Sequence, residues 1–128
     1  MPKTIVVSEQ APKPVAAYSR AVRAGDFLFL SGQIPIDPAT SELVAGDIQA
    51  QTRRVLENLR AVLAAANAGF QNVVKVSVFL TDMQDFAAFN AVYVTYFETE
   101  PPARATVAVS ALPRGARIEI EAVAYLGA

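Results

Sequence analysis

The chain has 128 residues, 53% of them hydrophobic and 18% charged, and its formal net charge is −1. This length suits one domain with a real core, so we expect a single domain over residues 1–128. The charge balance argues against nucleic acid as a partner. With neither cysteine nor histidine, the chain cannot form a disulfide, a Ser-His-Asp or Cys-His site, or the usual zinc site.

The hydropathy pattern predicts a cytoplasmic protein that assembles with copies of itself. A mean hydropathy of +0.31 is high for a chain with this many charges, which favours burial of apolar surface between subunits. The first residues lack the apolar core of a secretory signal peptide. No apolar run is long enough to cross a membrane, so we expect no membrane partner.

Three strands are expected in the first third of the chain. Lys3–Val7 and Tyr18–Val22 have strand-like composition, and a glycine turn leads into a third strand, Phe27–Leu30. The third strand should stop at Ser31-Gly32. Glycine at this point indicates either a plain turn or a close approach of another group to the backbone.

The middle of the chain predicts a loop, a helix and a buried strand. The loop covers Pro35–Gly46, and Asp47 is the expected helix N-cap. Apolar residues then recur with helical period, and Gly69 is the expected stop. Val73–Leu80 is apolar on both faces, which is typical of a strand in the centre of a sheet.

A second helix is expected over Met83–Phe97, with Thr81-x-x-Gln84 as its capping box. Its apolar stripe includes Phe86, Phe89 and Tyr93, and Asn90 falls on the same side. A buried amide must be hydrogen-bonded. Asn90 therefore either ties down a backbone group or braces a functional site.

Two strands, Arg104–Val109 and Arg117–Leu126, are expected to complete the sheet. Arg104 opens an otherwise uncharged run, and Glu121 stands among apolar neighbours, where an unpaired carboxylate is costly. Glu121 either forms a structural ion pair with a nearby arginine or shares a pocket with Arg104. The second alternative requires both side chains on one face of the sheet, and the sequence leaves the register open.

The expected element order is β-β-β-α-β-α-β-β, with two helices over one face of a sheet. This arrangement is an α+β layer. It leaves the other sheet face to be buried in some other way, which again favours an oligomer. No internal repeat, phosphate-binding glycine loop or metal-ligand cluster is apparent in the sequence.

Six motifs carry a family resemblance that covers nearly the whole chain. They are Tyr18–Val22, Leu30–Pro35, Val78–Asp82, Phe89–Tyr93, Pro102–Arg104 and Ile118–Ala122. In this order they resemble the reactive intermediate deaminase (Rid) family, the YjgF-like enamine and imine deaminases. The resemblance implies a chorismate-mutase-like fold, a mixed β-sheet with two helices packed on one face. It also implies a homotrimer with sites between subunits.

The resemblance implies roles for particular residues. Arg104 matches the arginine that binds the substrate carboxylate, and Glu121 matches the glutamate that positions or activates water. Ala16 and Ala17 stand where archetypal members have Gly-Pro, which could reshape the entrance. Thr106 occupies a place where many members have cysteine. The residues that the resemblance places in the lining of the site are Tyr18, Ser31, Gly32, Asn90 and Thr106.

The function implied is hydrolysis of 2-imino acids, such as 2-iminopropanoate formed from 2-aminoacrylate, to 2-oxo acids and ammonia. The small carboxylate substrate needs neither cofactor nor metal, because imines hydrolyse readily and require mainly positioning. A pathway-specific deaminase for an aminomuconate or a pyrimidine-derived aminoacrylate is an alternative. A non-catalytic module that binds small carboxylates is another. The acidic pI of about 5.4 and the missing histidines weigh against a ribonuclease role.

Overall fold

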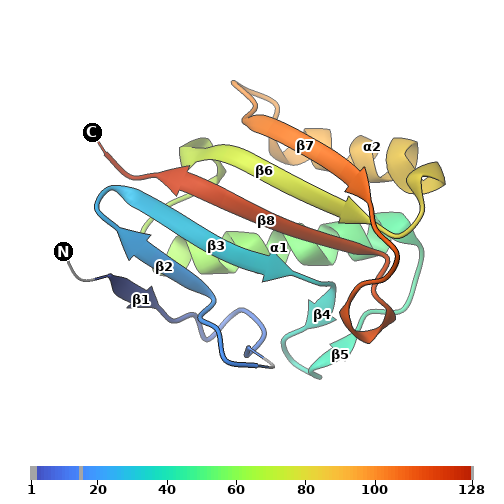
Figure 1. The fold of residues 1–128 in the computed structure, drawn as a ribbon, viewed down its shortest axis with the longest axis horizontal. Helices are drawn as coiled ribbons and strands as arrows, with labels where there is room; N and C mark the ends of the chain where they lie inside the picture. Colours follow the sequence, from blue (N-terminus) through green and yellow to red (C-terminus); the bar gives the residue numbers. More distant parts are fainter. Residues whose placement is uncertain (1–2, 15, 128) are drawn as a thin grey trace.

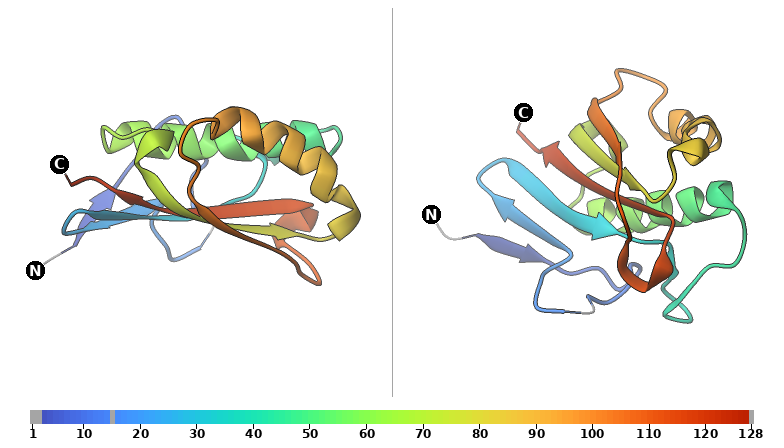
Figure 2. Two further views of the ribbon diagram at one scale, coloured as in Figure 1. Left: turned by 90° about the horizontal axis from the view of Figure 1, so that it is seen from above. Right: turned by 45° about the vertical axis from the view of Figure 1, so that its right-hand side comes forward.

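The computed structural model describes residues 3–14 and 16–127. Within these residues, six strands form one sheet in the order β1-β2-β3-β8-β6-β7, and two helices cover one of its faces (Figures 1 and 2). Strands β6 and β7 pair in parallel and their neighbours pair antiparallel, so the predicted mixed α+β sheet is confirmed. The elements of this sheet and its helices are β1 (Thr4–Val6), β2 (Ala21–Ala24), β3 (Phe27–Gln33), α1 (Ile48–Ala65), β6 (Val73–Leu80), α2 (Phe86–Tyr96), β7 (Ala103–Ala108) and β8 (Ile118–Tyr125).

Strands β2 and β3 differ from their predicted bounds. β2 begins at Ala21, not at Tyr18, because the backbone before it is bent. The Tyr18 amide donates to the Ala16 carbonyl, 2.9 Å away, which closes a tight turn. β3 continues to Gln33, past the predicted end at Leu30, because pairing with β8 resumes after an irregularity.

The predicted loop before α1 contains a two-stranded hairpin, β4 (Ile36–Asp37) and β5 (Glu42–Leu43). α1 then begins as expected, because the Asp47 carboxylate accepts a hydrogen bond from the Ala50 amide at 2.9 Å. Such a cap typically contributes about 1 kcal/mol to stability.

The helix α1 ends before the predicted stop at Gly69. Asn67 takes the left-handed conformation, with φ of 56°. Its amide donates to the Ala64 carbonyl, and the Ala68 amide donates to the Leu63 carbonyl. These two bonds form a Schellman motif, in which asparagine can replace glycine.

The second helix also starts differently from the prediction. Asp82, not Thr81, is the cap, and its carboxylate accepts a hydrogen bond from the Gln84 amide at 2.9 Å. The Thr81 amide instead donates to the Arg117 carbonyl, which ties this segment to the sheet. One turn of 3₁₀-helix, Met83–Asp85, follows the cap and leads into α2.

The core lies between the sheet and the two helices. Alternate residues of β8 face the helices, and Phe89 is the largest fully buried side chain on α2. This burial confirms the predicted apolar face of the last strand. The β8 residues of that face are Ile118, Ile120, Ala122 and Ala124, none more than 6% exposed.

The opposite sheet face has no helix over it (Figure 2), and we call it the open face. It carries large side chains with apolar rings. Phe27 on β3 pairs with Tyr125 on β8, and the centres of their rings lie 5.2 Å apart. Phe29 on this face is 49% exposed and Val107 is 44% exposed. An apolar surface of this kind favours contact with another protein surface. No helix in the described residues is both long and apolar enough to cross a bilayer.

Candidate active site

An irregular pairing between β3 and β8 builds the first part of the site. Ser31 and Gly32 together face one residue of β8, Glu121, which makes a β-bulge. Bulges bend a strand and re-aim its side chains, and they are common beside active sites. The glycine at the end of β3 therefore lies in a bulge. The plain turn that was one alternative for this position is not observed.

Gly32 leaves room for the side chain of another residue, which lies close to the backbone here. A Cβ atom at this position would overlap the carboxylate of Glu119. The structure therefore supports the second alternative for this glycine, a close approach of another group. Glu119 is half-buried and lies on the open face two residues before Glu121.

The two glutamates line a hollow of about 420 Å³. It contains four residues that the sequence predicted for the site, Tyr18, Ser31, Gly32 and Glu121, together with the unpredicted Glu119. We call this the acidic hollow. Its complete lining is Ala16, Tyr18, Ser31, Gly32, Ile34, Pro113, Glu119 and Glu121.

Electrostatics distinguish Glu119 as the group in the hollow suited to proton transfer. Burial raises the pKa of Glu119 above its ordinary value, and the neighbouring negative charge of Glu121 raises it further. A carboxylate is most useful as a general acid or base when its pKa moves toward the operating pH. The sequence analysis assigned this role to Glu121 and did not single out Glu119.

Ser31 has a fixed role in the wall of the hollow. Its hydroxyl donates a hydrogen bond to the Ser19 carbonyl at 2.6 Å. A serine hydroxyl has one proton and two lone pairs. Because the proton is already engaged, Ser31 can offer a ligand a lone pair while it anchors the segment that carries Tyr18.

A second cluster of polar side chains lies between β7 and α2. The Arg104 Nη1 atom donates to Asn90 Oδ1 at 2.7 Å. The guanidinium carbon lies 4.7 Å from the centre of the Tyr93 ring and within 5.6 Å of the ring centres of Phe86 and Phe89. Of the two alternatives for Asn90, this contact favours the one in which it braces a functional side chain. We call Arg104, Asn90, Tyr93 and Thr106 the arginine cluster.

Two other members of the arginine cluster are partly enclosed. Burial raises the pKa of Tyr93, and the charge of Arg104 offsets part of this effect. Thr106 lies on the same face of β7 as Arg104, two residues further on. Its hydroxyl oxygen is buried and has no hydrogen-bond partner among the described residues. A hydroxyl in this state is available to a ligand or a water molecule.

The acidic hollow and the arginine cluster lie on opposite faces of the sheet. Strand β6 separates β7 from β8, and Arg104 pairs with Val76 whereas Glu121 pairs with Ser77. Neighbouring residues of a strand point to opposite faces, so Arg104 faces the helices and Glu121 lies on the open face. The hypothesis that these two side chains share one pocket is wrong within a single chain.

The alternative of a structural ion pair for Glu121 is also not observed among the described residues. Arg104 is bonded to Asn90, and Arg114 donates to the Ser41 carbonyl at 3.0 Å. Arg117 forms its ion pair with Asp85, at 2.8 Å. The exposed Glu121 carboxylate remains at the rim of the acidic hollow.

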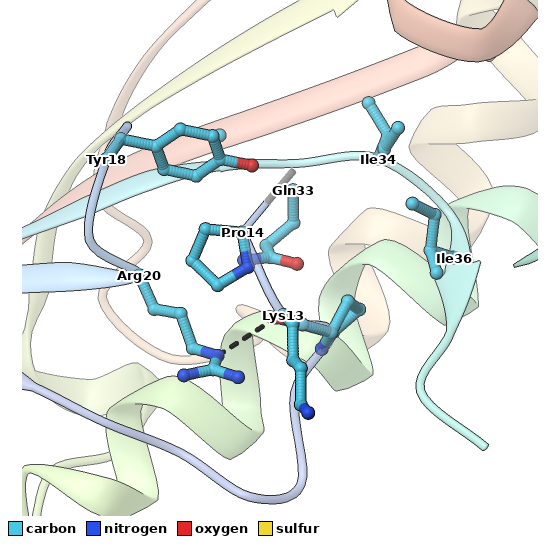
Figure 3. A pocket seen from close by; sticks show the side chains of 9 residues that line it. Lys13, Pro14, Tyr18, Arg20, Gln33, Ile34 and Ile36 are labelled. Carbon is cyan, nitrogen blue, oxygen red and sulfur yellow. Dashed lines mark hydrogen bonds between the residues drawn. The ribbon is translucent and has the colours of Figure 1, made fainter. Parts of the chain in front are cut away.

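A smaller hollow adjoins the acidic hollow, because Tyr18, Gly32 and Ile34 belong to both linings. Lys13, Pro14, Arg20 and Gln33 also surround it (Figure 3). Its volume of about 20 Å³ leaves room for about one water molecule. The acidic hollow is therefore the one with space for an organic ligand.

The fold and the site define an α+β protein with a carboxylate-lined hollow of small-molecule size. A family model described as Endoribonuclease L-PSP matches residues 8–126. The chain belongs to this family, the Rid/YjgF/L-PSP family. The predicted family and fold are thus confirmed.

Similar proteins support this assignment across the whole chain. A RutC family protein of Pyrococcus horikoshii is 55% identical over 123 residues, which cover 96% of this chain and 98% of the relative. A mouse 2-iminobutanoate/2-iminopropanoate deaminase is 42% identical, with 98% of this chain and 93% of the relative covered. The crystal structure of E. coli TdcF with bound serine is 38% identical, with a TM-score of 0.93 and coverage of 97% and 99%.

Proposed function

We propose that this protein hydrolyses 2-imino acids, or their enamine tautomers, to 2-oxo acids and ammonia. The observation that carries the proposal is the presence of two complementary groups, a braced guanidinium at Arg104 and a carboxylate of raised pKa at Glu119. The first suits a substrate carboxylate and the second suits proton transfer. The name of the mouse relative supports the reaction class, and the serine in TdcF supports a small amino-acid-like ligand.

The reaction would take place between neighbouring subunits of a homotrimer. Because the two groups lie on opposite faces of one sheet, a site that uses both needs one group from each of two copies. The open face supplies apolar surface for such contacts, including Phe29 and Tyr125. β7 is an edge strand of the sheet, so a second copy can approach Arg104 there.

Arg104 would bind the substrate carboxylate with its planar fork, through two parallel hydrogen bonds. Asn90 and the ring of Tyr93 already hold the guanidinium in place, which reduces the entropy lost on binding. The Thr106 hydroxyl lies beside this position and can take a further hydrogen bond.

Glu119 of the neighbouring copy would then act on water. Its carboxylate accepts a proton as the water oxygen bonds to C2 of the imine, and the electron pair of the C=N bond moves to nitrogen, which takes a proton from solvent water. The same carboxyl then returns its proton to the departing nitrogen. Ammonia leaves as the C=O bond forms, and the proton of the hydroxyl group passes to solvent water. We assign this role to Glu119 in place of Glu121, because Glu119 is the more buried of the two.

A direct assay tests this proposal. A serine dehydratase generates 2-aminoacrylate in place, and the release of ammonia and pyruvate is followed with and without the protein. We expect the protein to shorten the lifetime of the intermediate well below that of spontaneous hydrolysis. Binding of small carboxylates without faster turnover would instead identify a binding module.

The family description raises a ribonuclease activity as the competing function. Two glutamates line the hollow, and a carboxylate repels the phosphates of RNA. RNA incubated with the pure protein is therefore expected to remain intact.

The pH dependence of kcat/KM should report the protonation of Glu119. Activity rises with pH as this carboxyl loses its proton, and the midpoint should lie above the ordinary pKa of glutamic acid because burial and the charge of Glu121 both raise it. Glu121→Gln removes that charge, so we expect the midpoint to move to lower pH. Glu121→Asp keeps the charge and serves as the matched control. Lys75 on β6, which lines a separate hollow together with Glu121, is left unchanged. A midpoint that stays in place in Glu121→Gln would contradict the coupling.

A further inference from the structure

Two buried amide side chains interrupt the apolar stripe of α1. Asn58 is fully buried, and Gln51 is 8% exposed. About two turns of helix separate them, so they share one face of α1. The helix packs across β3 and β8 (Figure 1). A buried amide costs free energy unless it is hydrogen-bonded, so its partners indicate what it does in the fold.

Asn58 holds the chain just after the bulge of β3. Its Nδ2 atom donates to the Ile36 carbonyl at 3.0 Å and to the Ile34 carbonyl at 3.4 Å. Its Oδ1 atom accepts a hydrogen bond from Arg54 Nε at 3.1 Å, which fixes the orientation of the amide. Both ends of this side chain are therefore engaged. The first residue that it holds, Ile34, comes two positions after Gly32.

Gln51 holds the start of β8 in a similar way. Its Oε1 atom accepts a hydrogen bond from the Arg117 amide at 3.1 Å. Arg117 comes two positions before Glu119, whose carboxylate lies against Gly32. One helix thus contacts both strands of the β3–β8 pair, and each contact lies next to one of the two residues that approach each other.

The bulge leaves this approach without a regular ladder. Pairing of β3 with β8 is interrupted after Leu30 and resumes at Gln33. Because a bulge disrupts the ladder locally, hydrogen bonds between the two strands do not by themselves set the distance from Gly32 to Glu119. The two amides supply a fixed point on each strand, joined by a helix. All of these contacts lie within one chain, so each copy in an oligomer has them.

We infer that Asn58 and Gln51 are positioning residues, which set the distance between the bulge of β3 and the Glu119 carboxylate and so place this carboxylate for proton transfer. The part about proton transfer rests on the proposed deaminase function, and the part about the distance does not.

Replacing either amide should lower kcat. Asn58→Leu and Gln51→Met keep roughly the size of each side chain and remove its hydrogen bonds. A misplacement of about 1 Å at a reacting group can cost about 100-fold in rate, so we expect kcat to fall by about 10-fold or more. KM should change little, because Arg104 binds the substrate carboxylate from another strand of another copy.

A titration of Glu119 tests the positioning without an enzymatic assay. The ¹³C resonance of its carboxyl carbon, assigned with Glu119→Gln, is followed against pH in the assembled protein. Release of the bulge exposes the carboxylate, so its pKa should fall toward the ordinary value of glutamic acid in both variants. A role in stability alone would lower the unfolding temperature and leave this titration in place.

The charged groups around Glu119 are the same in both variants. Glu121 on the same strand raises its pKa by charge. Phe79 is its partner on β6 and does not titrate, and the bulge of β3 carries no charged side chain. Tyr18 lines the same hollow, and the Arg117 guanidinium is engaged in its own ion pair. A change in the titration therefore reports the position of the carboxylate.

Gln49→Met is the matched control. Gln49 lies on the same helix, and its Nε2 atom donates to the Ala88 carbonyl of α2 at 3.2 Å, so the variant loses a similar bond that does not reach β3 or β8. The pKa of Glu119 and kcat should stay unchanged in this variant. If Asn58→Leu does not fold, Gln51→Met decides alone.

An unchanged pKa of Glu119 in the folded variants would overturn the inference, and so would an equal change in Gln49→Met. A lower pKa in both variants of a protein that hydrolyses no imine would support the positioning and overturn only the proposed function.

Discussion

Glu119→Gln is expected to lower kcat for imine hydrolysis by about 100-fold or more, since general base catalysis typically contributes 10²–10⁴-fold. Glutamine keeps the size of the side chain beside Gly32 but cannot accept the proton of the attacking water. The fold should persist, because the Glu119 carboxylate forms none of the ion pairs found in the described residues. The measurement is the steady-state rate of ammonia release, corrected for spontaneous hydrolysis, with circular dichroism to verify folding.

Glu121→Gln is the matched control for Glu119→Gln. The two variants remove the same charge from the same face of β8, two positions apart. We expect the loss in kcat to be much smaller for Glu121→Gln, because Glu121 is exposed at the rim of the hollow. A larger loss for Glu121→Gln than for Glu119→Gln would return the catalytic role to Glu121.

Arg104→Ala should lower kcat/KM by roughly 30-fold or more, because losing one member of a buried charge pair typically costs about 2–5 kcal/mol. The effect should appear mainly in KM if the guanidinium binds the carboxylate equally in the ground state and the transition state. Arg104→Lys should recover only part of the loss, since an ammonium cannot form the paired hydrogen bonds of a guanidinium.

The control for Arg104 is an arginine remote from both halves of the site. Arg23 lies in an exposed ion pair with Asp26, at 3.5 Å, and Arg23→Ala should leave kcat/KM unchanged. Near-normal turnover by a folded Arg104→Ala protein would remove Arg104 from substrate binding.

The sequence predicts the elements well where the hydrophobic period is long and unbroken. The apolar alternation of β8 correctly places Ile118 and Ile120 in the core, and the run Val73–Leu80 correctly predicts an inner strand. Element ends were less predictable because local bonds decide them. Asn67, not Gly69, ends α1, and the turn at Ala16–Tyr18 delays β2.

The sequence singled out several residues that gather in the candidate site, but neither their arrangement nor Glu119. Tyr18, Ser31 and Gly32 do meet in one hollow, whereas Arg104 lies on the other face of the sheet. The parallel pairing of β6 with β7 produces this separation, and that pairing joins segments far apart in the sequence. Both glutamates of β8 share the open face, so alternation alone cannot choose between Glu119 and Glu121. The bulge at Ser31-Gly32 brings Glu119 close, and only the folded structure reveals it.

The central claim is that each active site contains residues of two copies of the chain. Activity of mixed oligomers tests this claim most directly. Arg104→Ala and Glu119→Gln subunits carrying different tags are co-expressed, and oligomers that contain both tags are isolated. Each parent should have a strongly reduced kcat/KM. In a trimer that contains both kinds of subunit, one of the three shared sites has both functional groups, so kcat/KM should recover to about one third of its normal value. Mixed oligomers no more active than their parents would contradict a site shared between subunits.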